Sequence, residues 1–285
     1  MVTLRVLLRR FPLAAYFSLV YAVSVVALAV VGLPGAAGGG DRQAQAGLVL
    51  FPVMVVAVGV IGVVLTAATD GREGLGALWS RMRRWRAGAR WYAVLLIPPA
   101  GILAVLLALR VLVSRAFAPN LFPVGLVFGL VAGWFEEVGW TGYAYPRMRA
   151  RWGALAAAVL LGGLWGLWHL PVVDWLGAAH PHGRSWLAFF VAFVAVLAAV
   201  RVLIGWLYTN TGSVLLAQLL HASSTGCLVM LGAAHVAAAQ EALWYALYAG
   251  VLWIGVAGVA IATGPRLTRT VGVGRDRPSA AGPLG

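Results

Sequence analysis

Long apolar runs separated by short arginine-bearing segments form the pattern of this 285-residue chain. A helix that crosses a bilayer needs roughly 20 apolar residues. Eight runs of about that length can be marked, at residues 12–33, 47–68, 92–113, 122–145, 154–176, 186–208, 213–231 and 242–262. A span outside a closed barrel satisfies its own backbone hydrogen bonds, so all eight are expected to be helices. The pattern predicts an all-α polytopic membrane bundle.

The composition supports a membrane protein and removes the main alternative. The chain is 62% hydrophobic and 10% charged, with a mean hydropathy of +0.92, whereas soluble domains are about 45–50% apolar and about 25% charged. The net charge of +13 could suggest nucleic-acid binding, but the basic residues lie between the apolar runs, where membrane topology explains them. We therefore expect a lipid bilayer and no nucleic acid as partner. The single cysteine, Cys227, cannot form an internal disulfide.

Arginines predict the orientation of the bundle. With eight spans, one side holds the N-terminus, the connections after the second and fourth spans, and the C-terminal tail. These regions carry Arg5, Arg9, Arg10, Arg72, Arg81, Arg83, Arg84, Arg86, Arg90, Arg147, Arg149, Arg151, Arg266, Arg269, Arg275 and Arg277, against Arg42, Arg115 and Arg184 in the opposite loops. Basic residues favour the cytoplasmic side, so both termini are expected there. The absence of lysine and the high Ala, Gly and Val content fit a GC-rich prokaryote, which predicts a multi-pass protein of a prokaryotic cytoplasmic membrane.

Two segments differ from the apolar runs, and the rest forms one domain over residues 1–263. Residues 70–90 place Trp79, Met82 and Trp85 at helical spacing among arginines, which is typical of a cytoplasmic amphipathic helix on anionic headgroups; a substrate-gating element is the alternative. Residues 264–285 are rich in Gly, Pro and Arg and are expected to be a disordered cytoplasmic tail.

Polar residues inside three neighbouring runs form the candidate site. Such residues are costly in a membrane and usually face a bundle interior or a cavity. They are Glu136, Glu137, His169, Arg201, Gln218, His221 and Thr225. Two adjacent carboxylates need a proton or a cation nearby, and neighbours on a helix point about 100° apart. One glutamate can therefore face a cavity while the other forms a structural ion pair, for instance with Arg201 or Arg147.

Two histidines strengthen the functional interpretation. Alone, His169 or His221 could be a hydrogen-bonded core residue. Together with the glutamates, they supply a base and imidazoles that can activate water and stabilise an oxyanion. Glu136, His169 and His221 are also zinc-ligand types, so a metal-dependent and a metal-free mechanism both remain open. The small residues from Ala222 to Gly226 permit close helix packing or leave room for a substrate.

These motifs resemble a known family. The segments "EEVGWTGYAYPRM", "LWGLWHLP" and "LLHASS" are similar to those of the CPBP family, which contains the CAAX prenyl proteases and bacteriocin-processing proteins and is also called ABI. Its pattern is Glu-Glu with an Arg four residues on, then Phe/Trp-x-x-x-His, then His-x-x-x-Asn. Glu136 and Glu137 match the pair, Trp165 and His169 the second motif, and His221 the third. The resemblance covers about residues 122–228.

The resemblance implies an intramembrane endopeptidase whose cavity opens toward the cytoplasm. It implies that Glu136 is the general base on a water, that His169 orients the water and that His221 stabilises the oxyanion. Glu137 would be a supporting carboxylate or an alternative acid. Peptides or membrane proteins, including CAAX-type substrates, would be the partners.

Two positions depart from the family pattern. Thr141 stands where the Arg is expected, so Glu137 needs another partner, and we expect Arg201. Thr225 stands where the Asn is expected, and its hydroxyl can donate one hydrogen bond. These departures keep a catalytically impaired membrane scaffold or immunity partner open as the alternative function. A proton-coupled transporter ranks last, because matching broken spans are not evident.

The remaining candidates have simpler interpretations. His180 and His182, in "HPHG", and His235 are expected in solvated loops, with an external metal clasp as the alternative for the first two. Most tryptophans suit interfacial belts. Trp134, Trp140, Trp165 and Trp168 flank the polar residues and are expected to shape the cavity.

Overall fold

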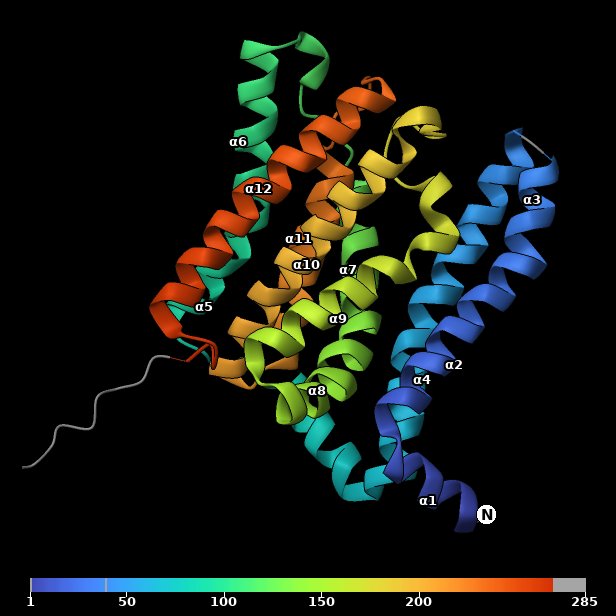
Figure 1. The fold of residues 1–285 in the computed structure, drawn as a ribbon, viewed down its shortest axis with the longest axis vertical. Coiled ribbons are helices and arrows are strands. Elements are labelled where there is room, and N and C mark those ends of the chain that lie inside the picture. Colours follow the sequence, from blue (N-terminus) through green and yellow to red (C-terminus); the bar gives the residue numbers. More distant parts are fainter. Residues whose placement is uncertain (1, 39, 269–285) are drawn as a thin grey trace, which may run out of the picture.

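The chain folds into a bundle of helices (Figure 1). The computed structural model describes residues 2–38 and 40–268, which contain no strand. The α-helices are α1 (Val2–Arg10), α2 (Pro12–Ala27), α3 (Leu33–Gly38), α4 (Gly40–Met82), α5 (Ala89–Ala93), α6 (Ile97–Leu112), α7 (Val124–Gly139), α8 (Tyr145–Trp152), α9 (Ala154–Trp168), α10 (Trp186–Thr211), α11 (Val214–Leu231) and α12 (Ala238–Thr263). Residues 269–285 of the predicted tail lie outside the described residues.

Short helical turns join several of these helices. Two are π-helical, η1 (Leu28–Gly32) and η4 (Trp140–Ala144). Four are 3₁₀ turns: η2 (Val94–Leu96), η3 (Arg115–Phe117), η5 (Leu170–Trp175) and η6 (Gly183–Ser185). The turn η4 directly follows the helix that carries the two glutamates, and π-helical turns are frequent at functional sites.

Six helical segments among the described residues are long and apolar enough to cross a membrane. They are Pro12–Gly35, Gln45–Met82, Ala89–Leu112, Gly183–Thr211, Val214–Leu231 and Ala238–Thr263. These segments coincide with six of the eight predicted runs and confirm the all-α membrane bundle. The count of eight spans and the cytoplasmic termini stay predictions.

The other two runs form shorter helices than expected. The run 122–145 is α7, of 16 residues, which continues through η4 into α8. The run 154–176 was expected to be one helix, but α9 ends at Trp168 and a 3₁₀ turn follows. Pro171 explains the early end, because proline lacks the backbone donor and disfavours helical geometry in the residue before it. His169 therefore lies at the end of a helix and not within a span.

The site-bearing helices lie in the middle of the bundle. Helix α10 packs against α9, α11 and α12, while α7 lies between α11 and α4. Figure 1 shows α2 and α4 on one flank and α6 and α12 on the other. The side chains of α10 are mostly buried, from Phe189 to Tyr208. A polar group on α7, α10 or α11 is thereby enclosed by protein.

Glycines set the close approach of α7 to α11. A Cβ on Gly129 would lie 2.5 Å from the carbonyl oxygen of Ala222 and 2.5 Å from the Cα of Gly226. A Cβ on Gly133 would lie 2.4 Å from the carbonyl oxygen of Gln218. Only glycine allows backbones to approach this closely, as in small-residue packing between membrane helices. This contact fixes the position of His221 relative to the glutamates.

The two ends of the bundle differ in their arginines. One end, the arginine-rich end, is formed by α1, the last part of α4, α8 and residues 264–268. Side-chain contacts join these parts, including Arg9 to the Thr69 carbonyl and Arg147 to Asp70. The opposite end, the arginine-poor end, is formed by residues 113–123, 170–185 and 232–237. Backbone hydrogen bonds from Asn120 and Phe122 to α11 belong to it.

The predicted amphipathic segment lies at the arginine-rich end. Helix α4 is interrupted at Gly71, whose φ is 70°, and its second part ends at Met82. Residues 84–88 are not helical, whereas the sequence predicted a helix as far as residue 90. Trp79 and Trp85 are exposed, and Arg81 donates to the Tyr208 hydroxyl at 2.7 Å. An interfacial position on headgroups stays a prediction.

Candidate active site

Glu137 is held by charged and polar partners on every side. Its side chain is fully buried. Arg201 donates to both carboxylate oxygens, from one nitrogen to Oε1 at 2.6 Å and from the other to Oε2 at 2.8 Å. His221 Nδ1 lies 2.8 Å from Oε1, and the Thr141 hydroxyl donates to Oε2. A carboxylate with four such contacts is a positioning group, because it has little capacity left to act as a base.

The predicted pairing of Glu137 with Arg201 is confirmed. Arg201 is buried on α10, and a Cβ on Gly162 of α9 would lie 3.1 Å from the Arg201 Cβ, so glycine makes room for it. Thr141 also contributes a donor from one turn further along the chain. The guanidinium that the family pattern places at position 141 thus comes from another helix here.

Glu136 has a different environment although it adjoins Glu137. Its Oε2 accepts hydrogen bonds from the indole N–H groups of Trp140, at 3.0 Å, and Trp165, at 2.8 Å. Among the described residues, no side chain bonds to its Oε1. The carboxylate is 3% exposed and lines a cavity. Two indoles orient the group and leave one oxygen for a ligand.

His221 connects the positioning carboxylate to the cavity. Its Nδ1 faces Glu137, and an acceptor carboxylate requires a hydrogen on that nitrogen. The ring also packs edge-on to Trp165, with centroids 4.8 Å apart. His221 and Thr225, one turn later on α11, both line the cavity. The arrangement fixes the imidazole so that Nε2 is the nitrogen available for chemistry.

His169 lines the same cavity from the end of α9. Its Nδ1 lies 2.9 Å from the Trp165 carbonyl oxygen. Because a carbonyl can only accept, Nδ1 carries the hydrogen, and the neutral ring has its lone pair on Nε2. The rings of Trp168 and Phe193 pack against it, with centroids 4.9 Å and 5.1 Å away. The helix end and these rings hold His169 as an oriented acceptor.

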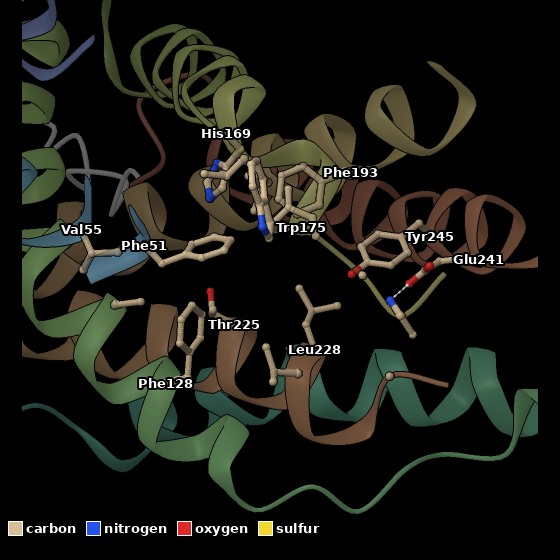
Figure 2. Close-up of a pocket in the computed structure, with 18 of the residues that line it drawn as sticks. Phe51, Val55, Phe128, His169, Trp175, Phe193, Thr225, Leu228, Glu241 and Tyr245 are labelled. Atoms are coloured by element: carbon tan, nitrogen blue, oxygen red, sulfur yellow. Dashed lines mark hydrogen bonds between the residues drawn. The ribbon is translucent and has the colours of Figure 1, made fainter. Parts of the chain in front are cut away.

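The cavity that collects these groups has a volume of about 360 Å³. Figure 2 shows His169 and Thr225 projecting from opposite walls, with Phe51 between them, Phe128 beside Thr225, and Tyr245 and Glu241 further along. The structure therefore brings together Glu136, His169, His221 and Thr225 from α7, α9 and α11. Glu137 lies behind His221 and is not part of the cavity lining.

The position of the cavity conflicts with one expectation. Its lining reaches loops of the arginine-poor end, at Asn120, Gly177, Ala178 and Ala233, and includes no residue of α1 or α8 among those described. The arginines predict that this end is non-cytoplasmic, whereas the resemblance implies a cavity open to the cytoplasm. The two expectations cannot both hold.

The candidate metal ligands do not form a metal site in this arrangement. In the described part of the chain, no three His, Cys, Asp or Glu side chains form a group that could hold an ion. Each of Glu136, His169 and His221 keeps one potential ligand atom outside the hydrogen bonds described above, but the three side chains do not form such a group, and zinc sites use at least three protein ligands. The arrangement of Glu136, His169 and His221 thus does not fit the zinc that the sequence left open.

The tryptophans near the site have separate functions. Trp140 and Trp165 bind Glu136, and Trp168 donates to the Ser24 hydroxyl at 2.7 Å. Trp134 and Trp140 were also expected to shape the cavity, but neither is part of the lining, and Trp134 is 47% exposed. The side chain of Trp134 instead lines a second pocket beside α4, together with Val63 and Trp79.

One loop histidine is buried, contrary to expectation. His180 and His235 are exposed, as predicted for loops. His182, however, is 1% exposed, and its ring stacks on Phe189 with centroids 3.8 Å apart. It lies 3.4 Å from Glu241, a buried carboxylate that also lines the cavity. Sequence reasoning missed Glu241, because it comes at the start of α12, where acidic residues are common caps.

Comparisons with known proteins agree with the motifs. Residues 118–227 match the family model described as type II CAAX prenyl endopeptidase Rce1-like. The chain is also 40% identical over 60 residues to CAAX prenyl protease 2 of Methanococcus maripaludis, which covers 21% of this chain and 20% of that protein. The matched region begins before α7 and ends within α11, and it contains the candidate residues Glu136, Glu137, His169, Arg201, His221 and Thr225. The lining residues on α4, in residues 228–234 and on α12 lie outside it.

The central part of this helical bundle, with its buried Glu-His site, is therefore similar to membrane-embedded proteins of CAAX-protease type. Together with the motifs, the two matches support the resemblance of residues 118–227 to the CPBP family. The aligned segment spans only about a fifth of the relative's length.

Proposed function

We propose that the chain is an intramembrane endopeptidase that hydrolyses peptide bonds in membrane-associated peptides or membrane proteins. The observation that carries the proposal is that two adjacent glutamates have different hydrogen-bonding environments. Glu137 has its hydrogen-bonding capacity filled by Arg201, Thr141 and His221, whereas Glu136 keeps one oxygen for a cavity ligand. A base beside oriented imidazoles in a water-restricted cavity suits hydrolysis.

The first step uses Glu136 as the general base. A water between its Oε1 and the scissile carbonyl gives a proton to the carboxylate, and the resulting hydroxide oxygen attacks the carbonyl carbon. His169, whose Nδ1–H is bound to the Trp165 carbonyl, accepts the other water hydrogen through Nε2 and thereby orients the water. The aromatic walls keep further water away from the reaction.

The second step collapses the tetrahedral intermediate. Its oxyanion accepts hydrogen bonds from the Thr225 hydroxyl and from Nε2–H of His221. Donation from Nε2 requires protons on both ring nitrogens, and the Glu137 carboxylate on Nδ1 stabilises that charge. The carboxylic acid of Glu136 then gives its proton to the leaving nitrogen as the C–N bond breaks. A carboxylic acid and an amine are released.

Replacement of Glu136 by glutamine tests the mechanism. The glutamine side chain keeps an oxygen for the two indole donors, so the fold should be retained while the base is lost. A tagged library of membrane peptides is incubated with the wild type, with Glu136→Gln and with Glu73→Gln, a matched control at an exposed glutamate. Cleavage should vanish in Glu136→Gln alone. Equal cleavage by all three proteins would remove the proposed mechanism.

The alternative function is a membrane scaffold or immunity partner with impaired catalysis. The observation in its favour is Thr225, whose side chain has a single short donor where the family pattern has an asparagine amide. A double variant, Glu136→Gln with His221→Ala, distinguishes the two functions in cells that lack the gene. Full rescue of the knockout phenotype by this variant would support the scaffold and reject the peptidase.

A further inference from the structure

The cavity extends well beyond the catalytic candidates. Glu136 and His221 line one part of it, whereas Gly232 and Trp244 line another. The stretch of α11 from His221 to Leu231, directly before Gly232, measures about 15 Å at 1.5 Å per residue. An extended peptide rises about 3.3 Å per residue, so about four or five residues of a bound chain would cover this distance.

The indole of Trp244 carries an unused donor in this second part of the cavity. Trp244 is 1% exposed, and its Nε1–H has no hydrogen-bond partner among the described residues. Most buried polar groups in proteins have a partner, because a buried donor without one is costly. A ligand that brings an acceptor into the cavity would satisfy this donor. The unpaired N–H therefore points to an occupant that carries a carbonyl.

The ring of Trp244 is fixed by its neighbours. Its centroid lies 4.1 Å from that of Tyr245 and 6.4 Å from that of Tyr248. A Cβ on Gly232 would lie 3.8 Å from the indole Cζ2, so the ring also lies beside the end of α11. Figure 2 shows Tyr245 further along the cavity than His169. A donor that is already held in place loses little side-chain freedom when it binds.

The group next to this donor also suits a peptide backbone. Asn120 lines the cavity, and its backbone N–H donates to the Leu231 carbonyl oxygen at 3.2 Å, so Asn120 borders the same end of α11. An amide side chain offers both donors and an acceptor. Together with the Trp244 indole, it can bind the carbonyl and the N–H of a peptide unit.

The carboxylate in this part of the cavity is already occupied. Glu241 accepts backbone hydrogen bonds from Ala178 at 2.8 Å and from Ala179 at 2.7 Å, one on each oxygen. It fixes a loop of the cavity wall and does not need a cationic ligand. Most other lining side chains are aromatic or aliphatic, and no arginine is among the described lining residues. Such walls favour an uncharged, apolar occupant.

Resting on the proposed function, we propose that Trp244 is a specificity-determining residue whose indole N–H binds a backbone carbonyl of the substrate about four or five residues from the scissile bond. The substrate is an extended, uncharged, apolar segment with its scissile bond at Glu136. Peptides that end closer to the scissile bond do not reach Trp244. Helix α12 lies outside the region matched by the family model, so the subsite is a property of this chain.

Substrates of different length test the subsite. One apolar peptide is prepared in a short form that ends about two residues from the scissile bond on both sides, and in two long forms extended by about six residues on one side or the other. In Trp244→Phe, the ratio of the KM for one long form to the KM for the short form should rise about two- to tenfold above the wild-type ratio. Trp79→Phe, at an exposed tryptophan outside the cavity lining, should keep the wild-type ratio.

An unchanged ratio in Trp244→Phe for both long forms overturns the proposal. An equal rise in KM for short and long forms leaves the ratio unchanged and shows a structural effect of the ring. This comparison has its own internal control, because a variant that cleaves the short form is folded.

Binding measurements separate the subsite from the proposed function. Fluorescence anisotropy in detergent gives the affinity of each labelled long form for Glu136→Gln and for Glu136→Gln with Trp244→Phe. The second variant should bind one long form about two- to tenfold more weakly. Equal affinities overturn the subsite, even where no peptide is cut. If Glu136→Gln still cleaves peptides while the affinities differ as expected, the assignment of the base fails and the subsite stands.

Discussion

Arg201 of α10 donates one hydrogen bond to each carboxylate oxygen of Glu137 on α7, at 2.6 Å and 2.8 Å. Its guanidinium also lies over the Trp165 ring, 4.7 Å from the centroid. Both side chains of the pair are fully buried. The fork geometry matches a carboxylate in a way that lysine cannot. Because Glu137 also binds His221, this pair sets the position of a catalytic candidate across three helices.

Removal of Arg201 should destabilise the protein strongly. Arg201→Ala leaves the Glu137 carboxylate buried without its cation, and breaking a buried pair in this way costs about 3–5 kcal/mol. The measurement is the unfolding midpoint of the purified protein in detergent. Arg110→Ala, at an exposed arginine of α6, is the matched control and should leave the midpoint unchanged. An Arg201→Ala protein that unfolds like the wild type and cleaves normally would show that the pair is dispensable.

Moving the guanidinium group from residue 201 to residue 141 tests the pairing with Glu137 more directly. Residue 141 lies one turn after Glu137 and already donates to it. Side chains four residues apart on a helix can pair, so Thr141→Arg in the Arg201→Ala background should recover part of the lost stability. Thr141→Arg alone should destabilise, since two guanidinium groups would compete for one buried carboxylate. If Thr141→Arg recovers no stability in the Arg201→Ala background, an arginine at position 141 cannot replace Arg201.

Trp165→Phe should slow cleavage without unfolding the protein. The variant keeps an aromatic ring but removes the N–H that bonds Glu136 Oε2 at 2.8 Å. A hydrogen bond to a charged group contributes about 1.5–3 kcal/mol, so kcat should fall by about tenfold or more. Trp134→Phe, at an indole that faces away from the cavity, is the control. Equal kcat values for both variants would show that the indole does not orient the base.

Gly129→Ala should weaken the contact between α7 and α11. The added methyl would lie 2.5 Å from the carbonyl oxygen of Ala222, so the helices must separate, and overpacking of this kind costs about 1–3 kcal/mol. The unfolding midpoint in detergent should decrease, and cleavage should decrease with it because His221 moves away from Glu137. Gly255→Ala, where a Cβ meets no atom within 4 Å, should be neutral. Equal midpoints for both variants would contradict the packing argument.

Trp244→Phe should raise KM and leave kcat nearly unchanged, because the indole N–H of Trp244 lines the cavity, is buried without a partner among the described residues, and can donate to a substrate carbonyl. The variant removes one donor that contributes about 0.5–1.5 kcal/mol to binding, which corresponds to a rise in KM of about two- to tenfold. Trp79→Phe, at an exposed tryptophan of the arginine-rich end, is the control. A fall in kcat with constant KM would instead place Trp244 among residues that act on the chemical step.

The sequence by itself determined the class of fold and most of the candidate site. Apolar runs of spanning length leave helices as the available structure, so six predicted runs appear as helices long enough to cross a membrane. Polar residues are so costly in such runs that Glu136, Glu137, His169 and His221 could be selected before their contacts were known. Arg201 could be named as a partner for the same reason.

The tertiary structure alone decided which glutamate faces the cavity. Adjacent residues on a helix differ by a rotation of about 100°. Only side chains from other helices decide their partners: Arg201 of α10 binds Glu137, and Trp165 of α9 binds Glu136. It also decided the end of α9 at Trp168 and the position of Glu241, which contacts Ala178 across 63 residues of chain. The end of the bundle that the cavity reaches depends on how loops from three connections meet, and no local pattern in the sequence encodes that meeting.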